Sequence, residues 1–271
     1  MTRLKNKVDQ LRRLLSGFDQ VGIAFSGGVD SSFLLRSALD ALGPDRVRVL
    51  HARSCLQKKQ EQESVDTWAE RQGYPAAAIQ QRIINIDPLA WDNFVVNPKN
   101  RCYLCKKHLY NLFRETLQQE GITDLLDGTN SDDLRQGKTG RPGLQALAEF
   151  GIRTPLADCG LDKKAIRTLS RNLGLDTADH PSSSCLATRI PHGVMITSER
   201  LNKIAELEQV LEENCFAGCR VRLDPSAEQT VFVEVQKAKL QQLSSDSMRK
   251  HIVTQLKKKG VLKIYLDLEG R

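Results

Sequence analysis

The sequence predicts an α/β fold in which a parallel sheet is covered by helices on both faces, followed by a smaller α+β domain. Three observations indicate this. Short apolar runs alternate with helical segments through the first two thirds of the chain, the first run ends in a serine- and glycine-rich turn, and a polar connector separates this part from a differently ordered remainder. In such sheets ligands bind at the carboxyl ends of the strands, where the turn lies.

The first elements follow the order helix, strand, glycine turn, helix. Apolar residues at helical spacing from Leu4 to Leu15 predict an opening helix. Residues 21–25 form a short apolar run typical of a buried strand. A helix over residues 33–42 follows the turn and ends at Gly43-Pro44.

The alternation then continues to residue 173. The next expected elements are strand, helix, strand, helix and strand over residues 47–51, 58–72, 78–86, 103–119 and 124–127. Residues 128–143 are mostly polar and glycine-rich, which favours a long active-site loop. A helix over residues 162–173 completes a first domain of residues 1–178.

The second expected domain, residues 179–271, begins with a polar connector that reaches residue 196. Its elements are then helix, strand, strand, two helices and strand, with the helix over 198–213 and the strands at 219–223, 230–235 and 262–266. This order predicts a small α+β domain.

Composition limits the class of protein. The chain of 271 residues is 40% hydrophobic and 27% charged, and it shows neither a signal peptide nor a membrane-spanning run, so we expect a cytoplasmic protein. Seven cysteines argue against a disulfide framework and favour metal or sulfur chemistry. A net charge of +7 suits an anionic ligand, whereas only 5% aromatic residues argue against nucleic acid as a partner.

The turn after the first strand is Ser26-Gly27-Gly28-Val29-Asp30-Ser31-Ser32. Two glycines between a strand and a helix let the backbone turn tightly and direct its amides at an anion, which the helix dipole also favours. The three serines add hydroxyl donors, and Asp30 is suited to hold Mg²⁺ against phosphates. We interpret the segment as the phosphate-binding loop of an ATP-consuming enzyme rather than a turn without function.

A second glycine lies at another expected strand end. Gly128 and Thr129 follow the strand at 124–127, where a glycine admits close approach of the backbone to a ligand. A plain turn explains the same residues equally well.

Three cysteines suggest a metal site. Cys102 and Cys105 place two thiolates within reach of one metal ion or cluster, and Cys185 lies in a separate serine-rich loop. Three ligands would leave one iron of a 4Fe-4S cluster open to an extra sulfide. A zinc site or an inert pair of cysteines remains an alternative.

The phosphate-binding segment resembles the PP-loop of ATP pyrophosphatases, whose Rossmann-like domain splits ATP between the α and β phosphates and adenylates a substrate. The resemblance narrows to the LarE family. Its motifs are Asn97 to Lys106, Asp127 to Asn130 followed by Arg141-Pro142-Gly143-Leu144, and Cys185 to Gly193. LarE proteins are sulfur transferases of nickel-pincer nucleotide cofactor synthesis.

The resemblance implies a reaction and a set of residues. A carboxylate of pyridinium-3,5-biscarboxylic acid mononucleotide would be adenylated with ATP and Mg²⁺ and become a thiocarboxylate. Members with cysteines matching all three positions are taken to bind a 4Fe-4S cluster, whereas single-cysteine members give up the sulfur of the position matching Cys185. The resemblance further implies catalytic roles for Asp30, Cys185 and Arg189, AMP contacts for Gly128 and Thr129, and a substrate contact for Lys106.

Two arginines alternate on the expected strand at 219–223. Arg220 and Arg222 share one face, where two guanidinium groups could hold a phosphate, and in the resemblance they match residues that bind the substrate phosphate. A solvated strand face is the alternative. Glu208 and Glu234 match acidic positions of a metal site in the family.

Other functions are consistent with the same loop. A PP-loop enzyme that thiolates tRNA with a 4Fe-4S cluster is the closest, but the chain shows no broad basic stripe. An amidating synthetase would need a glutaminase-sized extension, and a non-catalytic ATP sensor would not need the three cysteines. We expect a small-molecule substrate, no membrane partner and a homo-oligomer.

Overall fold

The structure, a computed structural model, describes residues 2–137 and 142–271 and divides into two compact units. The N-terminal unit comprises the residues up to Ser54, Lys59–Ile86 and Asn100–His180. The C-terminal unit comprises Cys55–Lys58, Asp87–Lys99 and Pro181–Arg271. The chain therefore changes unit near the expected boundary of residues 178 and 179, and in addition two short segments from its first half belong to the C-terminal unit.

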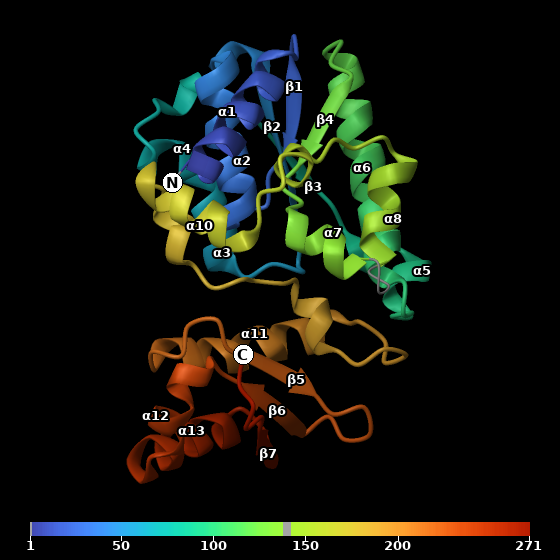
Figure 1. Cartoon of the computed structure of the whole chain (residues 1–271). Helices are drawn as coiled ribbons and strands as arrows, with labels where there is room; N and C mark the ends of the chain where they lie inside the picture. Colours follow the sequence, from blue (N-terminus) through green and yellow to red (C-terminus); the bar gives the residue numbers. More distant parts are fainter. Residues whose placement is uncertain (1, 138–141) are drawn as a thin grey trace. The chain divides into compact units, whose positions relative to one another are not determined.

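The N-terminal unit is built on a four-stranded parallel sheet. Its strands are β1 (Val21–Ala24), β2 (Val47–Arg53), β3 (Gln80–Asn85) and β4 (Asp124–Asp127), in the spatial order β3-β2-β1-β4 (Figure 1). Val21 of β1 pairs with Val47 on one side and with Asp124 on the other. The chain moves outward from β1 to β3 and returns to β4 on the other side, so the strand order reverses beside β1.

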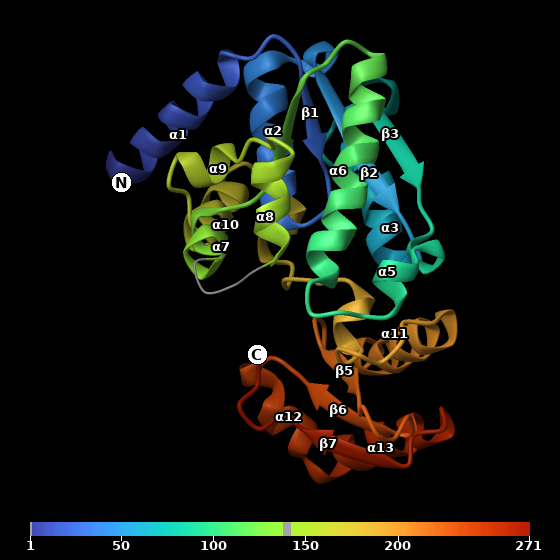
Figure 2. The same cartoon turned by 90° about the vertical axis from the view of Figure 1, so that its right-hand side faces the viewer.

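Helices cover both faces of this sheet, which confirms the predicted α/β fold (Figures 1 and 2). One face carries α1 (Thr2–Ser16), α2 (Val29–Leu42) and α10 (Lys163–Asn172), and the other carries α6 (Arg101–Gln119) and α8 (Pro142–Glu149). Each face has its own apolar core, one around Phe33 and one around Phe113. At Gly22 a Cβ atom would lie 2.4 Å from a methyl group of Leu117, so α6 packs directly against the backbone of β1.

Two expectations for this unit were wrong. The helix expected over residues 58–72 is two helices, α3 (Lys59–Asp66) and α4 (Trp68–Arg71). The expected loop over residues 128–143 contains a helix, α7 (Ser131–Gly137), and the start of α8; residues 138–141 lie outside the described part of the chain. Asn130 begins α7, because its Oδ1 atom accepts hydrogen bonds from the amides of Asp132 and Asp133 at 2.8 and 3.1 Å.

Several short elements were not expected from the sequence. The short α-helices are α5 (Asp92–Val95) and α9 (Pro155–Asp158). The 3-10 helices are η1 (Pro44–Arg46), η2 (Ala76–Ala78), η3 (Pro88–Ala90), η4 (Asp176–Asp179), η5 (Leu186–Arg189) and η6 (Lys237–Lys239). Such short turns leave little periodicity in a sequence.

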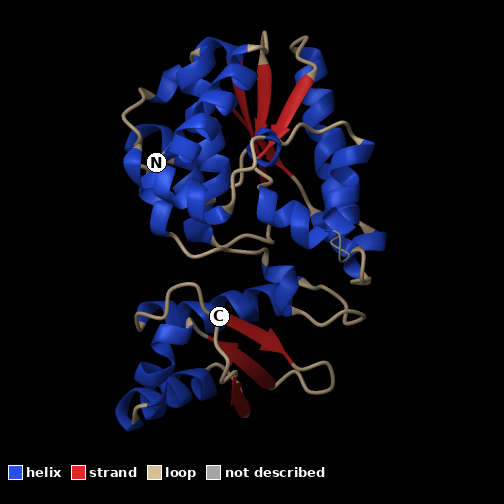
Figure 3. Cartoon of the chain, viewed as in Figure 1, coloured by secondary structure: helices blue, strands red, loops and turns tan. Residues whose placement is uncertain are grey.

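The C-terminal unit combines a small sheet with helices, as Figure 3 shows by colour. Strands β5 (Arg220–Leu223) and β6 (Thr230–Glu234) pair antiparallel, and β7 (Lys263–Leu266) pairs parallel with β6. The helices are α11 (Ser198–Glu213), α12 (Leu240–Ser244) and α13 (Asp246–Lys258). Val231 and Val233 of β6 are buried, whereas Phe232 between them is exposed and stacks on Tyr265 with ring centroids 5.1 Å apart.

Asn97 ties the segment Asp87–Lys99 into the C-terminal unit. The fully buried side chain of Asn97 donates hydrogen bonds to the carbonyl groups of Pro191 and Val194 at 2.7 and 2.9 Å. The main-chain carbonyl of Asn97 accepts a hydrogen bond from the Gly193 amide. Its φ angle of 56° is left-handed, which asparagine adopts more readily than most residues. The connector expected at residues 179–196 is thus fixed by a residue from the first half of the chain.

No helix in residues 2–137 or 142–271 combines the length and apolar character that a membrane span requires.

Candidate functional site

The segment Ser26 to Ser32 joins β1 to α2 at the carboxyl end of the central strand. Gly27 has a left-handed φ angle of 77°, and a Cβ atom there would lie 2.7 Å from a methyl group of Val65, so only glycine fits. Gly28 is the N-cap of α2 and makes no capping bond with a side chain. The segment therefore leads into the positive end of α2 without a capping side chain from Gly28, and phosphate binding there stays a prediction.

The serine hydroxyl groups have different environments. Ser26 Oγ and Ser31 Oγ lie 3.0 Å apart, and Ser31 Oγ donates to the carbonyl of Gly28 at 3.1 Å, so these two hydroxyl groups brace the turn. Ser32 is fully buried, and within the described residues its hydroxyl group has no hydrogen-bond partner. The loop therefore holds its shape through contacts between its own atoms.

Asp30 stands in the first turn of α2 and pairs with Lys163, the first residue of α10. Lys163 Nζ lies 2.5 Å from Asp30 Oδ2, whereas the buried Oδ1 atom has no hydrogen-bond partner in the described part of the chain. Burial raises the pKa of Asp30, and the ammonium group of Lys163 opposes this rise. An unpaired buried carboxylate oxygen beside an open helix terminus fits the predicted Mg²⁺ ligand.

The loop after β4 packs against the start of α2. A Cβ atom on Gly128 would lie 2.9 Å from the backbone nitrogen of Ser31, so a glycine is required at this position. The amide and hydroxyl groups of Thr129 both donate to Asp127 Oδ1. Gly128 and Thr129 thus support the loop Ser26 to Ser32 from the neighbouring strand. Their expected contacts to AMP stay a prediction.

Lys106, from α6, reaches the same end of the sheet. Its Nζ atom lies 3.8 Å from Asp127 Oδ2 and 5.5 Å from the centre of the Tyr110 ring. Burial by itself raises the pKa of Asp127, but Lys106, Thr129 and Tyr110 together hold it below its usual value. Asp127 is therefore ionised and paired with Lys106, Thr129 and Tyr110. The side chain of Lys106 is one third exposed.

Cys102 and Cys105 lie near the start of α6, three residues apart and thus on one face of the helix. Cys102 is exposed, Cys105 is half-buried, and neither forms a disulfide with another cysteine of the described residues. A Cβ atom on Gly143 would lie 3.9 Å from the Cβ atom of Cys102 and 3.4 Å from Cδ of Lys106. Of the neighbouring motif residues, Arg141 lies outside the described residues.

Cys185 belongs to the other unit. Within each unit, no group of three His, Cys, Asp or Glu side chains among the described residues could hold a metal ion. The predicted set Cys102, Cys105 and Cys185 draws on both units and stays a prediction.

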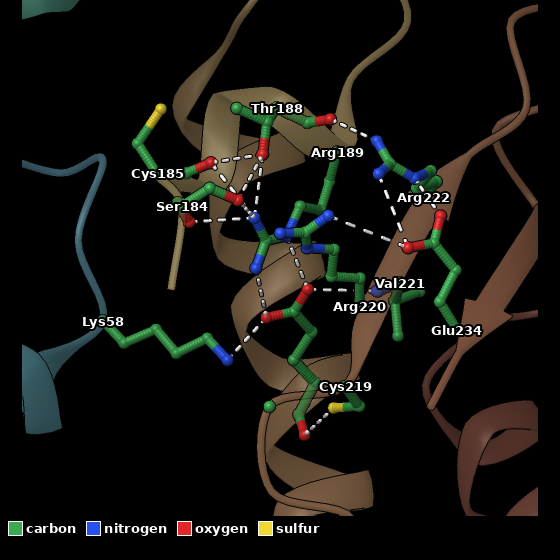
Figure 4. Close-up of polar contacts among 12 residues, drawn as sticks. Lys58, Ser184, Cys185, Thr188, Arg189, Cys219, Arg220, Val221, Arg222 and Glu234 are labelled. Carbon is green, nitrogen blue, oxygen red and sulfur yellow. Dashed lines mark hydrogen bonds and ion pairs between the residues drawn. The ribbon is translucent and has the colours of Figure 1, made fainter. Parts of the chain in front are cut away.

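Cys185 precedes η5, and Arg189 at the end of η5 holds the backbone around it (Figure 4). Arg189 Nη1 donates to the carbonyl of Ser184 at 2.8 Å, to its hydroxyl at 2.6 Å and to the hydroxyl of Thr188 at 2.8 Å. That hydroxyl in turn donates to the carbonyl of Cys185 at 2.8 Å. In Figure 4 the sulfur of Cys185 points away from these contacts, so Arg189 holds the main chain of this segment.

Glu208 of α11 is the buried counter-ion of this network. It accepts hydrogen bonds from Arg189 Nε at 2.8 Å and from the Val221 amide at 3.0 Å, and its Oε2 atom pairs with Lys58 Nζ at 2.5 Å. Burial raises the pKa of Glu208, but Arg189 and Lys58 bring it below its usual value. Glu208 is therefore the counter-ion of both Arg189 and Lys58.

Arg220 and Arg222 lie on one face of β5, as the alternation predicts, and both face Glu234 of β6. Arg222 forms a short ion pair with Glu234 and donates to the carbonyl of Thr188 at 2.7 Å. Arg220 is 4.0 Å from Glu234, and its buried Nε atom has no hydrogen-bond partner within the described residues. Burial, together with Arg271, Arg189 and Arg222, lowers the pKa of Arg220 to about 10. Such crowding of cations favours an anionic ligand.

Two residues of these sites were missed by sequence reasoning. Lys163 is remote in sequence from the segment Ser26 to Ser32 and shows no motif, although it follows Asp162, which caps α10. Arg271 belongs to no predicted element, yet its side chain donates to the carbonyl groups of Gly218 and Ser182. By contrast, burial raises the pKa of the Cys219 thiol to about 12, so this cysteine stays protonated.

Comparison with known proteins gives the chain its family. No family model matches it. An uncharacterized protein of Synechocystis sp. is 33% identical over 267 residues, which cover 98% of this chain and 95% of the relative. An uncharacterized protein of Methanocaldococcus jannaschii is 29% identical over 250 residues, covering 91% and 88%.

A third relative has a stated function. The pyridinium-3,5-bisthiocarboxylic acid mononucleotide synthase of Lactiplantibacillus plantarum is 31% identical over 222 residues, covering 82% of this chain and 78% of the synthase. This similarity spans most of both proteins, and the chain therefore belongs to the LarE family.

Proposed function

We propose that the protein is an ATP-dependent sulfur transferase that converts a carboxylate of pyridinium-3,5-biscarboxylic acid mononucleotide into a thiocarboxylate. The observation that carries this proposal is the similarity to a synthase named for the corresponding bisthiocarboxylic acid. The open N-terminus of α2 behind Gly27 and Gly28 supports the use of ATP, because it is suited to bind phosphates.

The first step is adenylation. A carboxylate oxygen of the substrate attacks the α-phosphorus of ATP, the bond to the β-phosphate oxygen breaks, and pyrophosphate leaves. In this step Ser26, Gly27, Gly28, Ser31 and Ser32 bind the phosphates, and Asp30 offers its unpaired Oδ1 atom to Mg²⁺. Negative charge that moves to the pyrophosphate is stabilised by the helix terminus and the metal ion.

In the second step a sulfide attacks the acyl carbon and AMP leaves, which yields the thiocarboxylate. Cys102 and Cys105 lie three residues apart on α6 and are partly open to solvent, which suits two ligands of a 4Fe-4S cluster, with Cys185 as the proposed third. The cluster, when bound, would supply the sulfide. Arg189 and Thr188 hold the main chain at Cys185, which keeps this ligand in one position.

The phosphate of the mononucleotide is assigned to the arginines of β5. Arg220 has an unpaired buried Nε atom and lies in a crowd of cations, both of which an anion would relieve. Arg222 is held by Glu234 and by the carbonyl of Thr188, so it presents a fixed guanidinium group. Lys106 is the remaining proposed substrate contact, because it is partly exposed beside Asp127.

The test is a reaction with defined components under anaerobic conditions. Purified protein, ATP, Mg²⁺ and the pyridinium biscarboxylic acid mononucleotide should release pyrophosphate only when the substrate is present, and mass spectrometry should find one oxygen exchanged for one sulfur. Release that depends on tRNA instead of the pyridinium compound would assign the protein to tRNA thiolation. No release with either would overturn an adenylating role.

Iron and sulfide analysis tests the cluster separately. We expect iron, acid-labile sulfide and a charge-transfer absorption band in the anaerobic protein, and their loss in the Cys102→Ala and Cys105→Ala variants. A protein that is active without iron, and that loses the sulfur of Cys185 during turnover, would show that the cysteine itself is the donor.

A further inference from the structure

Strand β7 lies at the end of the small sheet of the C-terminal unit, whose strand order is β5-β6-β7. Among residues 2–137 and 142–271, β7 pairs with β6 alone. The amides of Lys263 and Asp267 donate to carbonyl groups on the β6 side at 3.2 and 2.9 Å. Because backbone groups alternate in direction along a strand, those of Ile264 and Leu266 are directed to the other side. Such an edge is a template for a further strand.

The side chains along this edge are apolar and exposed. Leu262 and Leu268, at the two ends of β7, are 67% and 80% exposed, the highest values for any large apolar side chain that the structure describes. Tyr265 between them is 47% exposed, and Ile264 and Leu266 are only half-buried. Apolar area gathered on one unpaired edge indicates a surface that another strand covers.

The edge is complementary to its own sequence in the reverse direction. When two copies pair antiparallel about Tyr265, apolar residues face apolar residues and opposite charges face each other. The facing residues are Leu262 and Leu268, Lys263 and Asp267, and Ile264 and Leu266. Opposite charges that face across an antiparallel pair stabilise it. A lysine normally keeps other strands away from an edge, but here Asp267 of the second copy neutralises Lys263.

The direction of the backbone groups agrees with this register. In an antiparallel ladder, facing residues alternate between pairs that exchange two hydrogen bonds and pairs that exchange none. Ile264 and Leu266 have their amide and carbonyl groups on the free side of β7, so they form the hydrogen-bonded pair, once on each side of a twofold axis. Tyr265 and its copy form the pair without hydrogen bonds at the axis. A register shifted by one residue would set outward groups against inward groups.

We propose that β7 pairs antiparallel with β7 of a second copy of this chain, about a twofold axis at Tyr265, and joins the two three-stranded sheets into one continuous sheet. On one face, the stacked rings of Phe232 and Tyr265 from both copies then form a single aromatic row. The partner is a second copy because all the complementarity lies within one segment, as an interface about a twofold axis requires. The pairing strand contains none of the residues assigned to adenylation or sulfur transfer, so it is tested independently of that function.

An exchange of charges tests the register by analytical ultracentrifugation. Lys263→Asp sets two carboxylates against each other and Asp267→Lys sets two ammonium groups against each other, so each should raise the dissociation constant of the dimer roughly tenfold. The double variant faces opposite charges again and should associate like the wild type, which excludes misfolding as the cause of the loss. Lys258→Asp makes the same change of charge at an exposed position of α13 and should leave association unchanged.

Cross-linking tests the position of the axis. The Cα atoms of an antiparallel pair without hydrogen bonds are about 4.5 Å apart, which is within the range of a disulfide. Tyr265→Cys should therefore yield a disulfide-linked dimer on mild oxidation, and peptide mapping should find position 265 joined to its own copy. Phe232→Cys lies one strand further from the axis, about 14 Å from its copy, and should give no such product. The wild type shows the background from the native cysteines.

Two results would overturn the pairing of β7. One is a wild-type protein that sediments as a monomer over the whole concentration range. The other is an oligomer whose dissociation constant ignores both single charge exchanges and whose Tyr265→Cys variant does not cross-link, which would place the interface elsewhere on the chain.

Discussion

The carboxylate of Glu208 accepts two hydrogen bonds from the guanidinium group of Arg189, at 2.8 and 3.4 Å, and the two side chains are 0% and 2% exposed. The remaining nitrogen of Arg189 is directed at the backbone and hydroxyl groups around Cys185. Arg189 was expected to be catalytic. That role stays a prediction, and the contacts seen here connect the buried side of α11 to the cysteine segment.

Removal of Glu208 should therefore destabilise the fold strongly. Glu208→Ala leaves Arg189 and Lys58 without their buried counter-ion, and the loss of one partner of a buried pair costs roughly 3–5 kcal/mol. Urea unfolding measures this cost. The control is Glu206→Ala, two residues earlier on α11, because Glu206 pairs with Lys259 in solvent, and it should change the unfolding free energy only slightly. Similar effects of the two variants would show that the network contributes no special stability.

The two glycines next to α2 should respond differently to alanine. Gly128→Ala forces a Cβ atom to within 2.9 Å of the Ser31 backbone, so the melting temperature and ATP affinity should both fall. Gly28→Ala meets only Ser26 Oγ at 3.5 Å, an ordinary contact, so the melting temperature should be nearly unchanged. ATP affinity should still fall, because the methyl group occupies the approach of a phosphate. An unaffected ATP affinity in Gly28→Ala would place the phosphates elsewhere.

His51 predicts a pH dependence of stability. It is buried on β2 and its Nδ1 atom lies 2.8 Å from the Phe25 carbonyl; burial lowers its pKa below the ordinary 6.5. Below pH 6.5 His51 is therefore protonated to a greater extent in the unfolded chain than in the folded chain, so the free energy of unfolding falls as the pH falls. Between about pH 7.5 and about pH 5.5, the wild type should lose more unfolding free energy than His51→Asn, which keeps a donor to Phe25 but does not titrate.

The exposed His251 provides the matched control for this measurement. His251→Asn should follow the pH profile of the wild type. If His51→Asn also followed it, the imidazole of His51 would take up its proton equally in the folded and unfolded chains.

Sulfur transfer should depend on Cys185 but not on Cys219. Cys185→Ala should abolish the thiocarboxylate product, whereas substrate-dependent pyrophosphate release should continue because the phosphate-binding loop is untouched. Cys219→Ala is the control, since that thiol is buried and protonated. Thiocarboxylate formation that survives Cys185→Ala would contradict the proposed role of this cysteine. Both activities are measured in the same anaerobic reaction, by phosphate-coupled assay and mass spectrometry.

The parts of the fold that depend on local pattern were predictable from the sequence. The apolar run before Ser26 and the glycines after it identify β1, its loop and α2, because a buried strand and a helix start leave clear local signals. The alternation of Arg220 and Arg222 likewise predicts their common face on β5. In each case the information lies within a few residues.

What could not be predicted depends on contacts between distant segments. Lys163 meets Asp30 across 133 residues, and no spacing rule connects them. Helix α7 was taken for a loop, because its sequence is mostly polar and its start depends on the side chain of Asn130. Glu208 and Lys58 lie 150 residues apart, so their pairing is visible only once α11 is folded beside residues 55–58.

The division of the chain into two interleaved units limits how the protein can be divided into fragments. The chain passes between the two units after residues 54, 58, 86, 99 and 180, so neither unit is one continuous stretch. A fragment that began at Pro181 would lack Lys58, leaving the carboxylate of Glu208 with one cation fewer, and would lack Asn97, which fastens residues 191–194. Recombination at a single point near residue 180 therefore could not transfer the C-terminal unit intact to another protein, because it would leave residues 55–58 and 87–99 behind.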